Sequence, residues 1–210
     1  RFWKVSTQLD VLKGEVEHVS IDEFGRLVLG PVTRSIYDAT VPFIWCLAAA
    51  PDGTVFAGTG NDGQVLRVDR QGKTSVWFDA AELEVHALAV APDGTLYVGT
   101  SPDGQVYRVD AAGSSRVFFD PADKYIWSLV FDAQGRLHVG TGEKGIIYRV
   151  TQDGRGETLF TSTSTHVTAM AFDGEGRLIA GTDSPGRLVR IDPGGKAFVL
   201  LDSPYRELRA

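Results

Sequence analysis

The sequence predicts an all-β protein, a β-propeller built from four-stranded antiparallel blades. Three observations predict it: a Gly-Thr pair recurs every 41 residues, a turn glycine recurs at the same interval, and short runs of β-branched and aromatic residues separate these turns. The Gly-Thr pairs are Gly58-Thr59, Gly99-Thr100, Gly140-Thr141 and Gly181-Thr182. Four short strands in about 40 residues is the size of one propeller blade.

One repeat shows how its four strands are encoded. Residues 85–90 form an apolar innermost strand, and the second, third and fourth strands follow at 95–100, 105–110 and 116–119. Asp-Gly and Gly-rich turns separate them, because glycine readily adopts the positive φ that tight hairpins need. Each Gly-Thr pair follows a second strand, where a small residue lets neighbouring sheets approach closely.

The repeat arithmetic predicts a single propeller domain over residues 1–210, incomplete at its C-terminal side. Four full blades are expected, and they cover 43–79, 84–120, 125–161 and 166–202. A first, three-stranded blade is expected at 16–38, because Gly30 and Gly58 are 28 residues apart instead of 41. Residues 2–9 should form an outer strand and 206–210 an inner one. We therefore expect five blades in this chain and six or more in the full protein, since open strand edges are normally protected.

Composition excludes several classes of function. The net charge is −6, so a nucleic-acid partner lacks electrostatic support. No apolar run is long enough for a membrane span, so direct membrane insertion is not expected. Cys46 is the single cysteine, which excludes an intrachain disulfide, and its apolar surroundings predict a buried structural thiol.

The candidate binding residues lie where the repeats differ while their register is kept. Two positions, two residues apart, stand at the entry to each innermost strand, and such residues share one face of a strand. The crossover between blades should place them around one mouth of the central channel. The candidates are Phe43, Trp45, Glu84, His86, Tyr125, Trp127, His166 and Arg209. Aromatic residues interleaved with charges suit a binding surface, although the four Phe, Trp and Tyr rings could instead fill gaps between blades.

The repeat also resembles known propeller families. The stretches HALAVAPDGTLYVGTSPDGQVYRVD, WSLVFDAQGRLHVGTGEKGIIYRV and TAMAFDGEGRLIAGTDSPGRLVRID are similar to bacterial repeats of the broad WD40-like, NHL and SMP-30 grouping. They look closest to uncharacterised acidobacterial-type propeller proteins with YIWSLVFD and GTGEKG stretches. The grouping includes calcium-dependent lactonases, streptogramin-lyase-like enzymes with a His/Glu site, and non-enzymatic scaffolds. Their catalytic motifs do not match this sequence residue by residue.

The sequence therefore favours a non-catalytic binding or scaffold propeller that engages another protein, or a larger assembly, through the channel mouth. No catalytic residue and no cofactor is assigned. A periplasmic or extracytoplasmic location is expected, because a chain beginning at Arg1 is compatible with signal-peptide removal, and a cytoplasmic location stays open. The alternative is a lyase or lactonase-like enzyme acting on a small molecule at the mouth, with a metal held by Glu84, His86 and His166.

Overall fold

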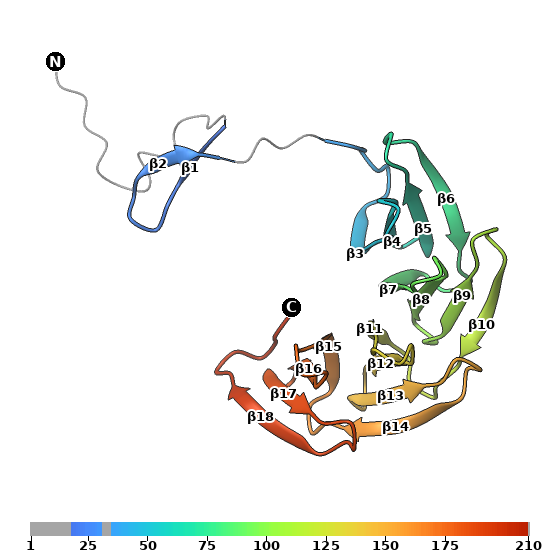
Figure 1. The fold of residues 1–210 in the computed structure, drawn as a ribbon, viewed down its shortest axis with the longest axis vertical. Coiled ribbons are helices and arrows are strands. Elements are labelled where there is room, and N and C mark those ends of the chain that lie inside the picture. The colour runs from blue at the N-terminus through green and yellow to red at the C-terminus, as the bar shows by residue number, and fades with distance from the viewer. Residues whose placement is uncertain (1–17, 31–34, 210) are drawn as a thin grey trace. The chain divides into compact units, whose positions relative to one another are not determined.

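The structure, a computed structural model, describes residues 18–30 and 35–209 (Figure 1). The chain forms two compact units, residues 1–38 and 39–210, and each is described here by itself. The described residues contain strands, turns and bends. No helix among them is long and apolar enough to cross a membrane.

The larger unit consists of four antiparallel sheets, each of four strands that pair in chain order. The first sheet contains β3 (Phe43–Ala49), β4 (Val55–Gly60), β5 (Gln64–Val68) and β6 (Thr74–Asp79). The second contains β7 (Glu84–Val90), β8 (Leu96–Ser101), β9 (Val106–Val109) and β10 (Ser115–Phe119). The third contains β11 (Ile126–Phe131), β12 (Leu137–Thr141), β13 (Ile146–Val150) and β14 (Gly156–Thr161). The fourth contains β15 (His166–Phe172), β16 (Leu178–Asp183), β17 (Arg187–Ile191) and β18 (Ala197–Asp202).

These sheets are the blades of a propeller, which confirms the predicted fold class. The first strands of successive blades contact one another, β3 with β7, β7 with β11 and β11 with β15. Figure 1 shows these strands on the inner side of the unit and β6, β10, β14 and β18 on its outer side. The core is interblade: it is formed by fully buried aliphatic residues such as Val85, Ile126 and Val167.

Each Gly-Thr pair has two structural roles. A Cβ added at Gly58 would lie 2.6 Å from Val85 Cγ1 of the next blade, and one at Gly99 would lie 2.5 Å from Ile126 Cγ2. The threonine that follows is buried, and its hydroxyl bonds backbone groups at the start of the third strand. Thr59 Oγ1 donates to the Gln64 carbonyl and accepts from the Gln64 amide, both at 3.0 Å. The pair therefore lies at the end of the second strand, where it permits close blade packing and closes the hairpin.

The smaller unit contains only one hairpin among its described residues, β1 (Val19–Ile21) paired with β2 (Leu27–Leu29). This corrects the predicted three-stranded blade at 16–38, since residues 35–38 form no strand. In a complete blade the outermost strand pairs with the third strand, as β6 pairs with β5. The shortened repeat has lost that third strand, so residues 35–38 have no neighbouring strand of their own blade to pair with. The outer strand predicted at residues 2–9 lies outside the described residues.

Residues 206–208 lie where the innermost strand of a following blade would begin. The Ser184 amide donates to the Arg206 carbonyl at 2.9 Å, and Arg206 is the repeat equivalent of Leu83, which directly precedes the innermost strand of the second blade. The Leu208 amide donates to the Thr182 carbonyl at 3.1 Å. The predicted inner strand is therefore present among the described residues as a single bridge, between Asp183 and Glu207.

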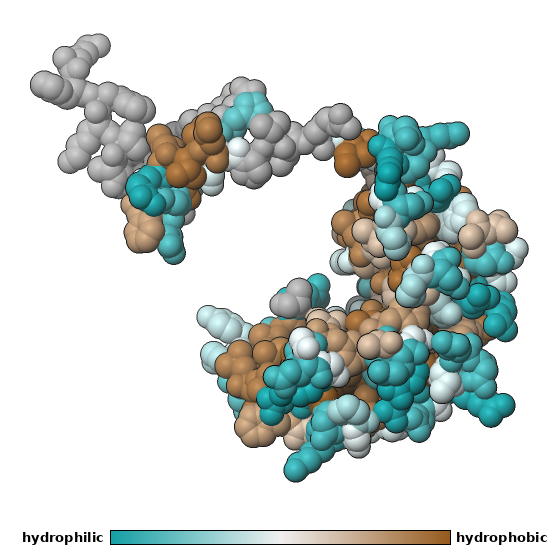
Figure 2. All heavy atoms as spheres, viewed as in Figure 1, coloured by the Kyte–Doolittle hydropathy of each residue, from teal (hydrophilic) through white to brown (hydrophobic). Residues whose placement is uncertain are grey.

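The first and last blades of this unit expose apolar residues on their outer faces. Ile44 of β3 is 46% exposed, whereas its equivalents Val85, Ile126 and Val167 are 0% exposed. Leu201 of β18 is 49% exposed. Figure 2 shows apolar residues gathered over the last blade. Both end faces thus have the composition of interblade surfaces, and the count of six or more blades stays a prediction.

The close approach at the second-strand glycine can be tested by substitution. We expect Gly99→Ala to lower the free energy of unfolding by about 1–3 kcal/mol, because its Cβ would overlap Ile126. Gly174→Ala is the matched control, since a Cβ there meets nothing within 4 Å and the glycine has no positive φ. Urea unfolding of both variants measures the difference. Equal stabilities would contradict the role assigned to the glycine.

Candidate functional site

The innermost strands bring the predicted mouth residues together in two stacked pairs. Phe43 and Trp45 lie on β3, with ring centroids 5.1 Å apart and planes 10° apart. Tyr125 and Trp127, at the start of β11, are 5.4 Å and 11° apart. Each pair is two residues apart in an extended chain, so both rings leave the strand on the same face. Because side chains alternate between the two faces of a strand, the two rings of each pair stack on each other.

Two histidines join the pairs into a continuous row across four blades. His86 of β7 lies between the tryptophans, with its ring centroid 5.4 Å from Trp45 and 4.5 Å from Trp127. His166 of β15 meets Trp127 edge to face, at 5.7 Å and 90°. We call this set of six residues the aromatic row. Its members are Phe43, Trp45, His86, Tyr125, Trp127 and His166.

His86 is held by the acid next to it on the same face of β7. Its Nε2 is 2.7 Å from Glu84 Oε2, and the His86 side chain is 10% exposed. Burial lowers the pKa of His86 below its ordinary value, while the hydrogen bond and the charge of Glu84 act in the opposite direction. The imidazole is thus oriented by Glu84 and surrounded by indole rings.

A hydrogen bond determines how His166 presents its ring to the mouth. Trp127 Nε1 lies 3.1 Å from His166 Nδ1. An indole nitrogen can only donate, so Nδ1 must accept and the proton of the neutral imidazole must be on Nε2. Gly142 makes room for this bond, because a Cβ there would lie 2.4 Å from Trp127 Nε1. His166 therefore offers the mouth an N–H donor.

A cavity of about 320 Å³ opens beside the aromatic row. Its lining residues are Trp45, His86, Trp127, His166, Thr168, Ala169, Asp183, Glu207 and Arg209. Arg209 forms an ion pair with Glu207. Glu84 lies outside this lining but is tied to it through His86. Every predicted binding residue thus lies in the aromatic row or directly beside it.

Four lining residues were not among the sequence candidates: Thr168, Ala169, Asp183 and Glu207. Asp183 differs from the others because it comes from a second strand and not from an innermost one. It ends β16, two residues after Gly181. The equivalent positions in the other blades hold Gly60, Ser101 and Gly142. A carboxylate at a position that is otherwise small and uncharged was the signal that could have identified it.

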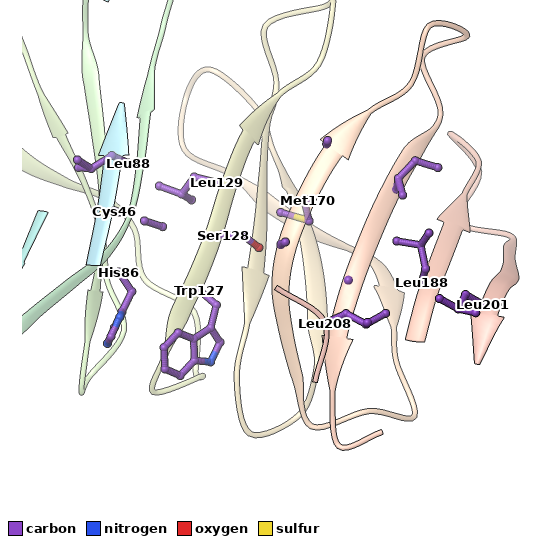
Figure 3. Close-up of a pocket in the computed structure, with 15 residues that line it drawn as sticks. Cys46, His86, Leu88, Trp127, Ser128, Leu129, Met170, Leu188, Leu201 and Leu208 are labelled. Carbon is purple, nitrogen blue, oxygen red and sulfur yellow. The ribbon is translucent and has the colours of Figure 1, made fainter. Parts of the chain in front are cut away.

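A second, larger cavity of about 650 Å³ runs along the inner strands (Figure 3). His86 and Trp127 line one part of it, and aliphatic residues such as Leu129 and Leu188 line the rest. Cys46 also lines it, and its Sγ is 3.4 Å from the Val85 carbonyl. Burial raises the pKa of Cys46 to about 12, so the side chain stays a thiol at neutral pH, as expected of a structural cysteine.

The alternative metal set does not form. Glu84 Oε2 is bonded to His86, whereas His166 accepts the hydrogen bond of the Trp127 indole N–H. Within residues 18–30 and 35–209, no group of three or more His, Cys, Asp or Glu side chains is arranged to hold a metal ion. The Glu84 carboxylate and the two imidazoles are thus engaged with different partners, Glu84 with His86 and His166 with Trp127.

Comparison with known proteins supports the fold and limits what else can be stated. Residues 31–66 match the family described as WD domain, G-beta repeat. No sequence relative was found among curated proteins. Many solved structures are similar. One is a catalytically inactive histidine-to-alanine variant of virginiamycin B lyase from Staphylococcus aureus with quinupristin (TM-score 0.68, 15% identity, 89% of this chain and 62% of that chain).

Two other similar structures have different functions. One is a putative gluconolactonase (TM-score 0.61, 15% identity, 90% of this chain and 71% of that one), and the other comes from a nidogen/laminin complex (TM-score 0.67, 19% identity, 78% and 66%). The chain spans 61–63% of the length of the lyase structures that it matches. At these identities the similarity shows the propeller fold alone.

The buried histidines predict a loss of stability in mild acid. Burial lowers the pKa of both His86 and His138 below 6.5, so just below that pH the unfolded chain binds more protons than the folded one. The free energy of unfolding should therefore be highest above about pH 6.5, and it should fall as the pH decreases toward the folded-state pKa values of the two histidines. Urea unfolding at pH 7.5 and 5.5 measures this loss. His86→Gln should reduce it, and an unchanged pH dependence in that variant would contradict the burial assigned to His86.

Proposed function

We propose that this chain is a binding propeller that engages a partner protein through its channel mouth. The observation that carries the proposal is the aromatic row, which crosses four blades and remains accessible at one end. Phe43 is 47% exposed and Trp45 is 41% exposed. Large aromatic residues with an apolar body and a polar edge dominate the binding energy of protein interfaces. An exposed stacked pair on a rigid sheet is suited to that role.

The polar residues of the mouth support recognition more than proton abstraction. A general base needs an available lone pair, but the Nδ1 lone pair of His166 accepts the Trp127 indole N–H. His86 Nε2 is directed at Glu84. Asp183, Glu207 and Arg209 add charge of both signs around the cavity, as in the polar rim of an interface. These groups would orient a partner that packs on the aromatic row.

The proposal extends to the kind of partner and its location. The similar structure from a nidogen/laminin complex shows that a propeller of this shape occurs in a protein complex. The net charge of −6 disfavours nucleic acid as the partner. We place the protein in a periplasmic or extracytoplasmic space, where it would bind another protein or contribute to a larger assembly with additional blades.

Trp45→Ala tests this function. The variant should weaken partner binding at least about tenfold, because an exposed interface tryptophan is a typical hot spot. Its melting temperature should change little, since Trp45 is 41% exposed. The immobilised protein would be used to capture partners from the extracytoplasmic extract of its source, and the dissociation constant of the purified partner would then be measured.

Phe198→Ala is the matched control for that experiment. Phe198 is also exposed and aromatic, but it lies on the outermost strand β18, where its ring contacts Arg190. This control should bind the partner as the wild type does. Equal binding by Trp45→Ala would overturn the assignment of the mouth. A large fall in its melting temperature would assign the Trp45 ring to the core.

The second candidate is an enzyme that acts on a small molecule at the same mouth. The observation in its favour is a histidine at a propeller cavity: His166 lines the 320 Å³ cavity, and the similar lyase is inactivated by a histidine-to-alanine substitution. In this chain the N–H at Nε2 would make His166 a proton donor to a leaving group, with Asp183 and Glu207 nearby.

A direct assay separates the two functions. The purified protein would be incubated with quinupristin and, separately, with gluconolactone, and the products would be followed by mass spectrometry. The binding function predicts that each compound is consumed at the same rate with wild type as with His166→Ala. Turnover that is lost in His166→Ala and retained in Phe198→Ala would establish the enzyme instead.

A further inference from the structure

The larger cavity, which runs along the inner strands, is not used by the function proposed for the mouth. It encloses about 650 Å³. That volume lies in the usual range for small-molecule sites. Among the described residues that line it, none is Asp, Glu, Lys or Arg. The cavity therefore presents an apolar wall to any molecule that enters it (Figure 3).

Three side chains at one position of the repeat form the part of this wall that lies on the innermost strands. Leu88, Leu129 and Met170 are 41 residues apart, and each is only partly buried. Figure 3 shows them one after another across three blades. Leu188 and Leu201 line the remainder of the cavity, but they belong to the last blade's β17 and β18. Only the innermost strands are therefore assigned to the ligand.

The polar atoms in this wall already have hydrogen-bond partners. Ser128 Oγ donates to the Val167 carbonyl at 3.1 Å. The Cys46 thiol lies 3.4 Å from the Val85 carbonyl and donates to it. These groups gain nothing from a polar ligand, so the part of a ligand that lies along the wall is expected to be a hydrocarbon.

The apolar cavity reaches the mouth. His86, Trp127 and Ala169 line both the 650 Å³ cavity and the 320 Å³ cavity beside the aromatic row. A ligand whose hydrocarbon part lies on the innermost strands can thus place its other end among the charged residues of the mouth. Those charges decide which end group fits.

Glu84 is the carboxylate near the mouth that has no cationic partner. Each of the other two is paired with an arginine: Asp183 with Arg206 and Glu207 with Arg209. The Glu84 side chain is 31% exposed, and its ion-pair contact within residues 18–30 and 35–209 is with His86. Burial lowers the pKa of His86, so this imidazole carries no charge at neutral pH. The negative charge of Glu84 is therefore left to attract a cation.

An indole ring lies on the other side of the same imidazole. The centroid of Trp45 is 5.4 Å from that of His86, and Trp45 is 41% exposed. The face of an indole ring attracts cations. Leu88 lies four residues beyond Glu84 on β7, a span of about 13 Å that a chain of roughly eight to ten carbons covers.

We propose that the channel binds primary alkylammonium ions, with the alkyl chain along Leu88, Leu129 and Met170 and the ammonium group at Glu84 beside Trp45. The carboxylate supplies the charge and hydrogen-bond acceptors that an ammonium group needs, and the innermost strands remove the chain from water. The site does not depend on a protein partner at the mouth.

Three compounds with the same chain and different end groups test the choice of ligand: octylammonium, 1-octanol and octanoate. Binding to the purified protein would be measured by calorimetry. Wild type should bind octylammonium at least about tenfold more tightly than octanoate, with 1-octanol between them, because Glu84 attracts the first and repels the last. Butylammonium should bind at least about tenfold more weakly than octylammonium, since it buries fewer methylene groups.

Glu84→Gln separates the charge from the hydrocarbon contact. Glutamine can still accept a hydrogen bond from His86, and this variant should bind octylammonium and 1-octanol equally. Glu157→Gln is the matched control and should bind as wild type does, because Glu157 lies on the outermost strand β14 and pairs with Arg149. Retention of the octylammonium preference in Glu84→Gln would overturn the assignment of the ammonium group.

Met170→Gln tests the wall, because glutamine has a similar length and a polar end. It should weaken the binding of all three octyl compounds at least about tenfold. Circular dichroism would establish that the variant is folded, and the comparison of butylammonium with octylammonium tests the same contact without any substitution. Equal binding of these two chain lengths by wild type, equal binding of the three octyl compounds, or no binding of octylammonium would overturn the proposal.

Discussion

The close contact between neighbouring blades at the second-strand glycine is the constraint on which the rest of the structure depends. Val85 and Ile126 occupy the space that a side chain at Gly58 or Gly99 would need. This contact sets how near each innermost strand lies to the blade before it. Because it recurs in the same register, the entries to the innermost strands lie at the same level. The aromatic row can therefore cross blades that are far apart in the sequence.

Within that frame, positions that depart from the repeat generate the features able to bind. Asp183 places a carboxylate where other blades have a small residue, and it lines the mouth. Leu159 and His138 stand where other blades have aromatic residues, and both line a groove between the third and fourth blades. Residues that follow the repeat are already engaged in packing or in hairpin hydrogen bonds.

The two ends of the blades differ in their chemistry. At the mouth, each imidazole is tied to a neighbour, His86 to Glu84 and His166 to Trp127. The rings are thereby oriented while the aromatic faces of Phe43 and Trp45 remain partly exposed. At the opposite end of the blades, the imidazole of His138 is buried and packs edge to face on Phe172 of the next blade. The rigid, partly exposed surface of the mouth suits a large partner.

The sequence by itself determined the blade, its four strands, its turn glycines and the residues that stand at the channel mouth. These features follow from two local rules: side chains alternate between the two faces of a strand, and tight turns need a positive φ, as at Gly94. The 41-residue repeat shows the same pattern several times. Only the tertiary structure decided that residues 35–38 form no strand, because a strand needs a neighbour to pair with. It also decided that the Trp127 ring contacts both His86 and His166. Such contacts depend on where side chains from different blades meet, and no spacing along one chain specifies that.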